Sequence, residues 1–96
     1  ERLQQLKALF ERYGRMYGID WLKLAAQAYQ ESQLDQSVRS PAGAIGIMQL
    51  LPSTASGQPI NVHNIEQLEN NIHAGAKYMH HLRTSYFNDT AISVGD

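Results

Sequence analysis

The sequence has no cysteine among its 96 residues. It can therefore form neither a disulfide framework nor a cysteine-based zinc site. Long hydrophobic runs are absent too. The longest nearly apolar stretch, residues 44–51, includes Gly46 and Gln49 and is far too short to span a bilayer. At this length the chain is expected to form one domain with a small core.

An excess of charge of one sign is also missing, since the formal net charge is −1. Residues 1–48 contain six Lys and Arg against five Asp and Glu, and residues 49–96 contain two against four. Neither half has the basic surface of a nucleic-acid binder, so no nucleic-acid partner is expected. No signal peptide opens the chain at Glu1, and we expect that an N-terminal region preceded it.

What the sequence does contain is helical periodicity, with apolar residues that recur every three or four positions. A first helix is predicted over residues 3–17, ended by Gly18. A second is predicted to follow an N-cap at Asp20 and to run to about Gln33. Their predicted apolar faces are Leu3, Leu6, Leu9, Phe10, Tyr13, Met16 and Tyr17 in the first helix, and Trp21, Leu24, Ala25 and Ala28 in the second.

A third, long helix is predicted to begin between residues 64 and 70 and to end at Asn88-Asp89. Before it, residues 40–43 have turn chemistry, Pro52 is expected to open a turn or a short helix, and residues 56–64 form a polar loop. The pattern predicts a mostly α fold whose helices are joined by two sizeable loops. The predicted apolar face of the third helix is Leu68, Ile72, Gly75, Ala76, Met79, Leu82 and Tyr86.

Glu31 is the first candidate for chemistry, because it lies at the edge of the apolar stripe of the second helix. A carboxylate at such an edge loses hydration, which favours the protonated form that a general acid needs. The alternative is a solvated glutamate at a helix end. Asp35, one turn later, could form a glycosidase pair with Glu31 or could simply be a turn residue.

Ser40 and Gln49 are polar side chains within a run of small and apolar residues, where they can orient a ligand or stabilise a turn. The four histidines raise the question of a metal. His73 and His80 lie two turns apart on one helix face, but no acidic ligand matches them, so no metal and no cofactor are expected.

Three stretches carry a resemblance to a known family: Glu31-Ser32, the run from Ser40 to Leu50, and Pro52-Ser53-Thr54-Ala55. Together they resemble the catalytic signature of family 1 lytic transglycosylases, the soluble-lytic-transglycosylase domain. Residues 71–78 resemble a further motif of this family. The resemblance covers roughly residues 17–86 and is nearest to the membrane-bound lytic transglycosylase F type.

The resemblance implies a lysozyme-like helical fold and cleavage of the β-1,4 bond between N-acetylmuramic acid and N-acetylglucosamine in peptidoglycan. It implies that Glu31 acts first as an acid and then as a base, and that the product is a 1,6-anhydro sugar. The nucleophile belongs to the substrate, so no second carboxylate is required. By position, Ser40 and Gln49 match the family's sugar-orienting residues. Met48 is expected to line the cleft, and Gly46 to allow the sugar to approach closely. Ser32 is expected to form hydrogen bonds at the helix end, and Gly75 to be a site of helix packing.

One departure concerns the family's Ala-Tyr-Asn-x-Gly motif, which is missing before Asp96. We therefore expect residues 1–96 to be the N-terminal part of the catalytic domain, incomplete at its C-terminus and with little or no activity alone. The missing wall is expected to leave a face through which copies can associate. The resemblance further implies a bacterial periplasmic or envelope location, with membrane association through a missing N-terminal region.

Two other functions stay open at this stage. One is a hydrolase on the same fold, similar to goose-type lysozyme, which would release reducing ends in place of anhydro ends. The other is a helical module that binds glycans or a partner and does not cleave.

Overall fold

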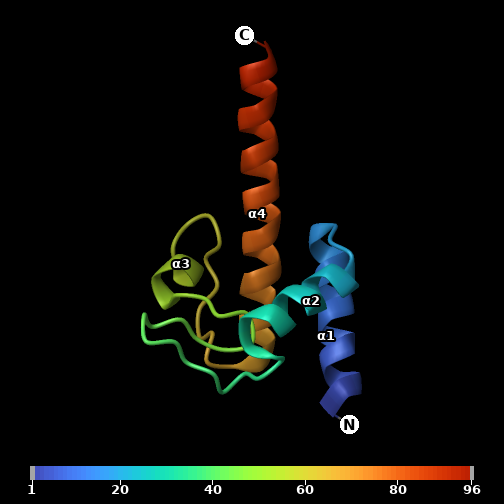
Figure 1. Ribbon diagram of the computed structural model, residues 1–96, viewed down its shortest axis with the longest axis vertical. Helices are drawn as coiled ribbons and strands as arrows, with labels where there is room; N and C mark the ends of the chain where they lie inside the picture. The colour runs from blue at the N-terminus through green and yellow to red at the C-terminus, as the bar shows by residue number, and fades with distance from the viewer. Residues whose placement is uncertain (1, 96) are drawn as a thin grey trace.

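A computed structural model describes the backbone of residues 2–95 and the side chains of residues 2–85. Within them lie four helices: α1 (Arg2–Tyr17), α2 (Trp21–Ser32), α3 (Pro52–Ser56) and α4 (Leu68–Gly95). Figure 1 shows α1 beside the lower half of α4, with α2 crossing in front and α3 on the other side of α4. Residues 2–95 contain no sheet but only isolated bridges that Ile45 makes with Arg39 and Leu50. The predicted mostly α fold is confirmed.

The connection between α1 and α2 follows the predicted capping. Gly18 ends α1 in the left-handed region, with φ at 69°, where glycine avoids the steric cost of a Cβ. Asp20 then caps α2, because its Oδ1 accepts the backbone N–H of Leu22 at 3.0 Å. At the other end of α2, Gln33 adopts the left-handed conformation and its N–H bonds to the carbonyl oxygen of Tyr29.

The core lies where α1, α2 and the lower half of α4 meet two loops. One is formed by residues 33–51, which we call the central loop, and the other by residues 57–67. Each of these elements contributes side chains at helical or loop positions that are removed from solvent, and their burial drives the fold. These buried side chains include Phe10 of α1, Leu24 and Ala28 of α2, Ile47 of the central loop, and Ile72, Ala74 and Ala76 of α4.

Three residues placed on apolar faces by periodicity are exposed instead. Leu3 is 66% exposed, Met16 is 54% exposed and Leu82 is 49% exposed. Leu3 and Met16 lie near the two ends of α1, and Leu82 lies at the middle of α4. Periodicity identifies the helix face but not the length over which a neighbour covers it.

The prediction that the last helix ends at Asn88-Asp89 is wrong, because α4 continues to Gly95. Asparagine and aspartate are only moderately unfavourable inside a helix, and no proline or glycine interrupts residues 76–94. The predicted face position Tyr86 lies outside the described side chains.

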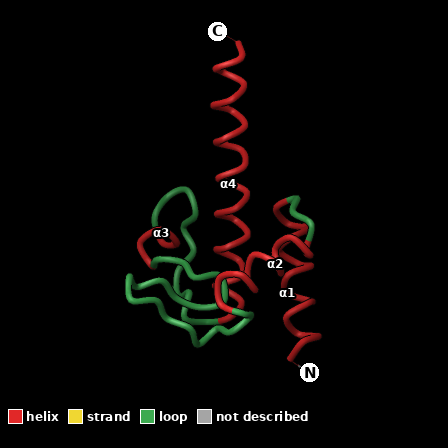
Figure 2. The backbone as a smooth tube through the Cα atoms, in the orientation of Figure 1, coloured by secondary structure: helices red, strands yellow, loops and turns green. Residues whose placement is uncertain are grey.

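The loops are extensive and lie on one side of α4, as the green segments of Figure 2 show. Pro52 begins α3 at its first turn, as expected. The segment predicted as a polar loop is only partly polar, because Ile60 and Val62 are buried in the core together with Ile65.

A polar cluster joins α1 to α4 beside this core. Tyr13 Oη donates to Glu69 Oε2 at 2.6 Å, and Tyr17 Oη lies 2.7 Å from His73 Nε2. Burial and then the hydrogen bond to Glu69 raise the pKa of Tyr13 to about 12. Burial, with a smaller effect of the Lys77 charge, lowers the pKa of His73.

None of the helices within residues 2–95 is long and apolar enough to cross a membrane.

Candidate active site

Glu31 lies in the last turn of α2, where it borders an open depression of about 440 Å³. Its carboxylate accepts a hydrogen bond from Gln27 Nε2, one turn earlier, at 3.3 Å. The side chain is exposed, so the loss of hydration predicted from its place on the stripe is not found. The buried positions of α2 are Leu24, Ala28 and Ser32, spaced four residues apart, and Glu31 lies beside that row. The depression is lined by Gln30, Glu31, Ser32, Gln33, Asp35 and Val38.

Ser32 fastens the end of α2 to the central loop. Its buried hydroxyl lies 2.8 Å from the carbonyl oxygen of Ile47 and 3.1 Å from that of Ala28, and it accepts the N–H of Asp35 at 3.1 Å. The prediction that Ser32 is a hydrogen-bonding residue at the helix end is confirmed. Because Ser32 follows Glu31 directly, these bonds also fix the backbone that presents the Glu31 carboxylate.

Two side chains not singled out from the sequence hold the central loop in place. Asn71, fully buried in α4, accepts the N–H of Met48 at 2.8 Å and donates to the carbonyl oxygens of Ile45 and Ile65 at 2.9 and 2.8 Å. Gln36 accepts the N–H of Ile47 at 2.9 Å. The bonds accepted by Asn71 and Gln36 satisfy the N–H groups of Met48 and Ile47, which have no backbone partner among the described residues.

The amide of Gln36 also reaches the segment before α4. Its Nε2 donates to the carbonyl oxygens of Ile65 at 3.1 Å and Glu66 at 3.0 Å. A signal for Asn71 was present in the sequence, since it occupies a buried position of the same helix face as Leu68 and Ile72. A polar side chain on such a face needs partners, and here the partners are loop backbone.

Gly46 is required by this packing. It has a φ of 83°, and a Cβ there would lie 2.6 Å from Gln36 Nε2 and would also overlap the Asn71 amide. The expected close approach to Gly46 is therefore made by these two protein side chains.

Met48 is 5% exposed and packs under α4, where its Cγ would lie 2.6 Å from a Cβ placed on Gly75. The expectation that Met48 lines an open cleft does not match this placement, because the side chain belongs to the core. The expected role of Gly75 as a packing site matches it.

Ser40 and Gln49 both stabilise the loop that they belong to. Ser40 Oγ accepts the N–H of Ala44 at 3.0 Å. Gln49 Nε2 donates to the carbonyl oxygens of Val38 at 3.0 Å and Gly46 at 2.8 Å. No hydrogen bond among the described side chains uses Gln49 Oε1, which leaves this oxygen as an acceptor for a ligand.

Asp35 behaves as a turn residue. Its Oδ1 accepts the N–H of Ser37 at 2.9 Å and the Ser37 hydroxyl at 2.7 Å. These hydrogen bonds lower the pKa of Asp35, because they stabilise the charged form. Asp35 therefore stays ionised and occupied by its own loop, which suits a structural role.

No group of three or more histidine and acidic side chains within the described part of the chain is arranged to hold a metal ion. The nearest partners of His73 are the two tyrosines of α1, with ring centroids 4.7 Å away for Tyr13 and 5.7 Å away for Tyr17. His73 thus packs between helices.

The helical fold and a glutamate at the end of α2, held against a clamped loop, define a lysozyme-like class of domain. Residues 8–95 match the family described as the transglycosylase SLT domain, and the chain belongs to this family. It is 42% identical over 82 residues to a protein named membrane-bound lytic murein transglycosylase F from Erwinia tasmaniensis, a match that covers 85% of this chain.

Two further relatives bear the same name. The one from Shewanella pealeana is 42% identical over 78 residues, or 81% of this chain, and the one from Pectobacterium atrosepticum is 42% identical over 82 residues, or 85%. The matches cover 15 to 16% of the relatives' own lengths, so the chain spans a small part of the proteins that it resembles.

Proposed function

We propose that this chain carries the proton-transferring part of a peptidoglycan lytic transglycosylase. The observation that supports it is the placement of Glu31, whose accessible carboxylate borders an open depression on a backbone fixed by Ser32. Catalysis by proton transfer needs an acid that substrate can reach and that is held in position. The names of the relatives support the same reaction class.

In the proposed reaction, protonated Glu31 donates its proton to the glycosidic oxygen as the bond from that oxygen to C1 of the muramoyl sugar breaks. The carbonyl oxygen of the substrate's own N-acetyl group stabilises C1. The Glu31 carboxylate then takes the proton of the C6 hydroxyl while the C6 oxygen bonds to C1, and this step gives the 1,6-anhydro product. Asp35 takes no part, in keeping with its bonds to Ser37.

The other site residues are proposed to act on substrate position. Gln49 would accept a hydrogen bond from a sugar through Oε1, and Ser40 would orient the N-acetyl group. Gly46 and Met48 would act indirectly: Gly46 leaves room for the loop clamp, and Met48 packs the loop under α4. None of these four residues is proposed to take part in the proton transfer.

Peptidoglycan strands are the proposed partner, and the bacterial envelope is the proposed location, since the relatives are named as membrane-bound murein enzymes. Attachment to a membrane, including the outer membrane, is proposed to need a region beyond these residues. Self-association is proposed through exposed apolar side chains, which include Leu22 and Tyr29 of α2 and Leu82 of α4. A rise in sedimentation coefficient with concentration would support it, and a constant value for the monomer would contradict it.

A chimera tests the proposed activity directly. The matched 82 residues of the Erwinia tasmaniensis relative are replaced by those of this chain, and purified peptidoglycan is digested and analysed by mass spectrometry. We expect anhydro-muropeptides from the chimera, none above background from its Glu31→Gln variant, and near-parental yield from Asp35→Asn. Reducing ends that depend on Glu31 would favour the hydrolase, and bound glycan with no cleavage would favour the binding module.

A further inference from the structure

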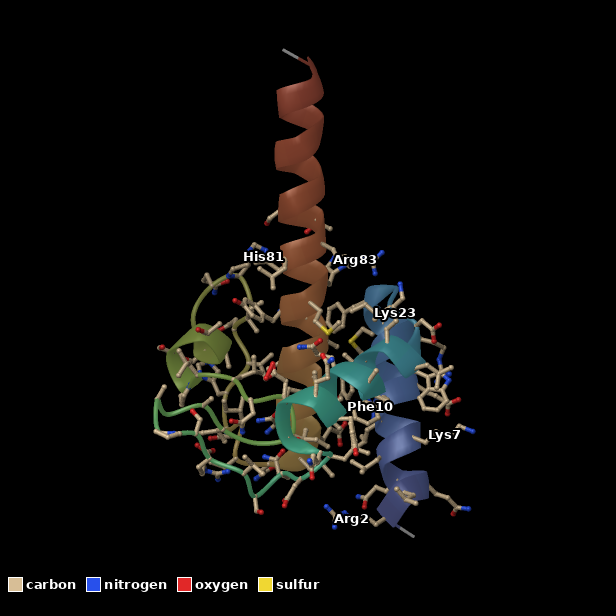
Figure 3. The ribbon with its side chains drawn as sticks, in the orientation of Figure 1. Arg2, Lys7, Phe10, Lys23, His81 and Arg83 are labelled. Carbon is tan, nitrogen blue, oxygen red and sulfur yellow. The ribbon has the colours of Figure 1, made fainter. Side chains whose placement is uncertain are left out.

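A second depression, of about 300 Å³, lies on the side of α4 that faces away from α2. Four of its lining residues belong to α4, at positions 77, 80, 81 and 84, and these positions share one face of a helix. Met79 lies on the opposite face of α4 and lines the groove beside α2. Figure 3 shows His81 and Arg83 on opposite sides of α4. We call this hollow the α4 depression; its other walls are Tyr17, Pro59 and Ile60.

The α4 depression contains one cationic side chain, Lys77, and no acidic one. The sequence has no aspartate or glutamate between Glu69 and Asp89, although the chain as a whole has a net charge of −1. No carboxylate lines the depression, and the ion pair of Arg12 with Glu69 is the only one among the described side chains. The Lys77 ammonium group therefore has no anionic partner there.

Some of the hydrogen-bond donors that line the α4 depression already have partners within the chain, and others do not. Tyr17 Oη is paired with His73, and Thr84 Oγ1 lies 3.1 and 3.0 Å from the carbonyl oxygens of His80 and His81. Within the described residues no hydrogen bond uses the Lys77 ammonium or the imidazoles of His80 and His81. These groups are donors suited to an oxyanion.

The opposite wall is apolar. Ile60 is 2% exposed and forms part of the core, Pro59 precedes it, and the Tyr17 ring lies 5.9 Å from the His80 ring. A hollow with an apolar wall and a few convergent donors is the usual form of a small-molecule site.

We propose that the α4 depression binds a small organic anion, with a carboxylate or phosphate group held by Lys77, His80 and His81 and an apolar part against Pro59 and Ile60. None of these residues borders the Glu31 depression. The proposal therefore stands or falls independently of peptidoglycan cleavage.

Binding is measured by NMR titration of the ¹⁵N-labelled 96-residue chain at constant ionic strength. The probes are N-acetyl-D-alanine, which places a carboxylate on a small apolar body, and inorganic phosphate. N-acetyl-D-alaninamide, which lacks the charge, is the control. We expect saturable amide shifts at residue 60 and residues 77–84 with at least one anion and none with the amide.

The variants separate a site from general charge attraction. Lys77→Gln and His80→Gln should each raise the Kd about fivefold or more, the size expected for one charged contact near a surface. Arg83→Gln removes a charge from the same helix but outside the depression and should leave the Kd unchanged. His80 is exposed, so its variant carries the test if circular dichroism shows that Lys77→Gln does not fold.

Saturation by N-acetyl-D-alanine alone supports a carboxylate site, saturation by phosphate alone supports a phosphate site, and saturation by both supports a shared oxyanion site. Three results would overturn the proposal: no saturation by either anion, equal shifts with the amide, or a Kd raised as much by Arg83→Gln as by Lys77→Gln.

Discussion

Asn71 and Glu31 show how single side chains shape this site in different ways. Asn71 is buried and satisfies three backbone groups of the loops, so its identity is fixed by hydrogen bonding. Glu31 is exposed and has one hydrogen bond, to Gln27, so its identity is not explained by stability. A residue that the fold does not need, at the border of a hollow, is a candidate for function.

Replacing Asn71 by alanine should lower the free energy of unfolding by about 1–3 kcal/mol, because the buried N–H of Met48 loses its acceptor. The carbonyl oxygens of Ile45 and Ile65 each lose one of two donors. Chemical denaturation of the parent and the variant measures the difference. Asn70→Ala is the matched control, since the exposed Asn70 amide makes one bond, to the carbonyl oxygen of Asn64. A loss for Asn71→Ala no larger than that for Asn70→Ala would contradict the clamp.

At the residue scale, the sequence indicated which positions of the site carry polar or small side chains, but not what those side chains contact. Ser32 and Gly75 were assigned their observed roles. Gln36 and Asn71 were missed because most of their partners lie 11 to 30 residues away in the chain. The place of Asn71 on a buried helix face indicates that it needs partners but not which ones. Met48 was expected to line the cleft, and only the packing of α4 over the loop shows that its side chain is 5% exposed.

At the scale of elements, the contact between α4 and the central loop depends on the absence of a side chain at Gly75. Gly75→Ala places a Cβ 2.6 Å from Met48 Cγ and 2.9 Å from its Cβ. We expect a loss of about 1–3 kcal/mol in unfolding free energy from overpacking. Adding Met48→Ala should restore the room, and thermal denaturation of both single variants and the double variant gives their coupling. Strictly additive losses would contradict this contact.

The contact between α1 and α4 predicts a pH dependence through His73. Its pKa is lowered in the folded chain, so below about pH 6.5 the unfolded chain binds more protons and stability falls. His73→Gln should reduce the difference in unfolding free energy between pH 8 and pH 5.5. His63→Gln, which removes an exposed loop imidazole, should leave this difference as in the parent. A pH dependence unchanged by His73→Gln would refute the assignment.

The end of α1 and the starts of α2 and α3 were predictable from the sequence, because Gly18, Asp20 and Pro52 act through local backbone chemistry. The end of α4 was not. Asn88-Asp89 is a weak stop signal, and the helix passes through it. The burial of the loop before α4 was also underestimated. Ile60 and Val62 are separated by a polar residue, so no continuous apolar run marks the segment, and their burial depends on packing against the rest of the core.

At the scale of the whole molecule, the upper half of α4 rises beyond the other helices in Figure 1. Leu82, Leu22 and Tyr29 are exposed, and the matched segment is 15 to 16% of the relatives' lengths. In this chain Glu31 also remains hydrated. Together these features favour a site whose surroundings are open when the chain is alone.

We therefore expect the 96-residue chain alone to produce anhydro-muropeptides at least about a hundredfold more slowly than the chimera, because lost positioning groups cost orders of magnitude in rate. Initial rates from timed digests, normalised to protein concentration, give the comparison. Equal rates would contradict the account of an open site.

The central claim is that Glu31 transfers the protons of a lytic transglycosylase, and one comparison tests it most directly. Muropeptides released by the chimera, its Glu31→Gln variant and its Asp35→Asn variant are analysed by mass spectrometry, after circular dichroism has shown that all three are folded. The account predicts 1,6-anhydro ends from the chimera and from Asp35→Asn, and a loss of at least about a thousandfold in Glu31→Gln, the range expected when a general acid is removed. Anhydro ends at similar yield from Glu31→Gln, or no anhydro ends from the folded chimera, would contradict it.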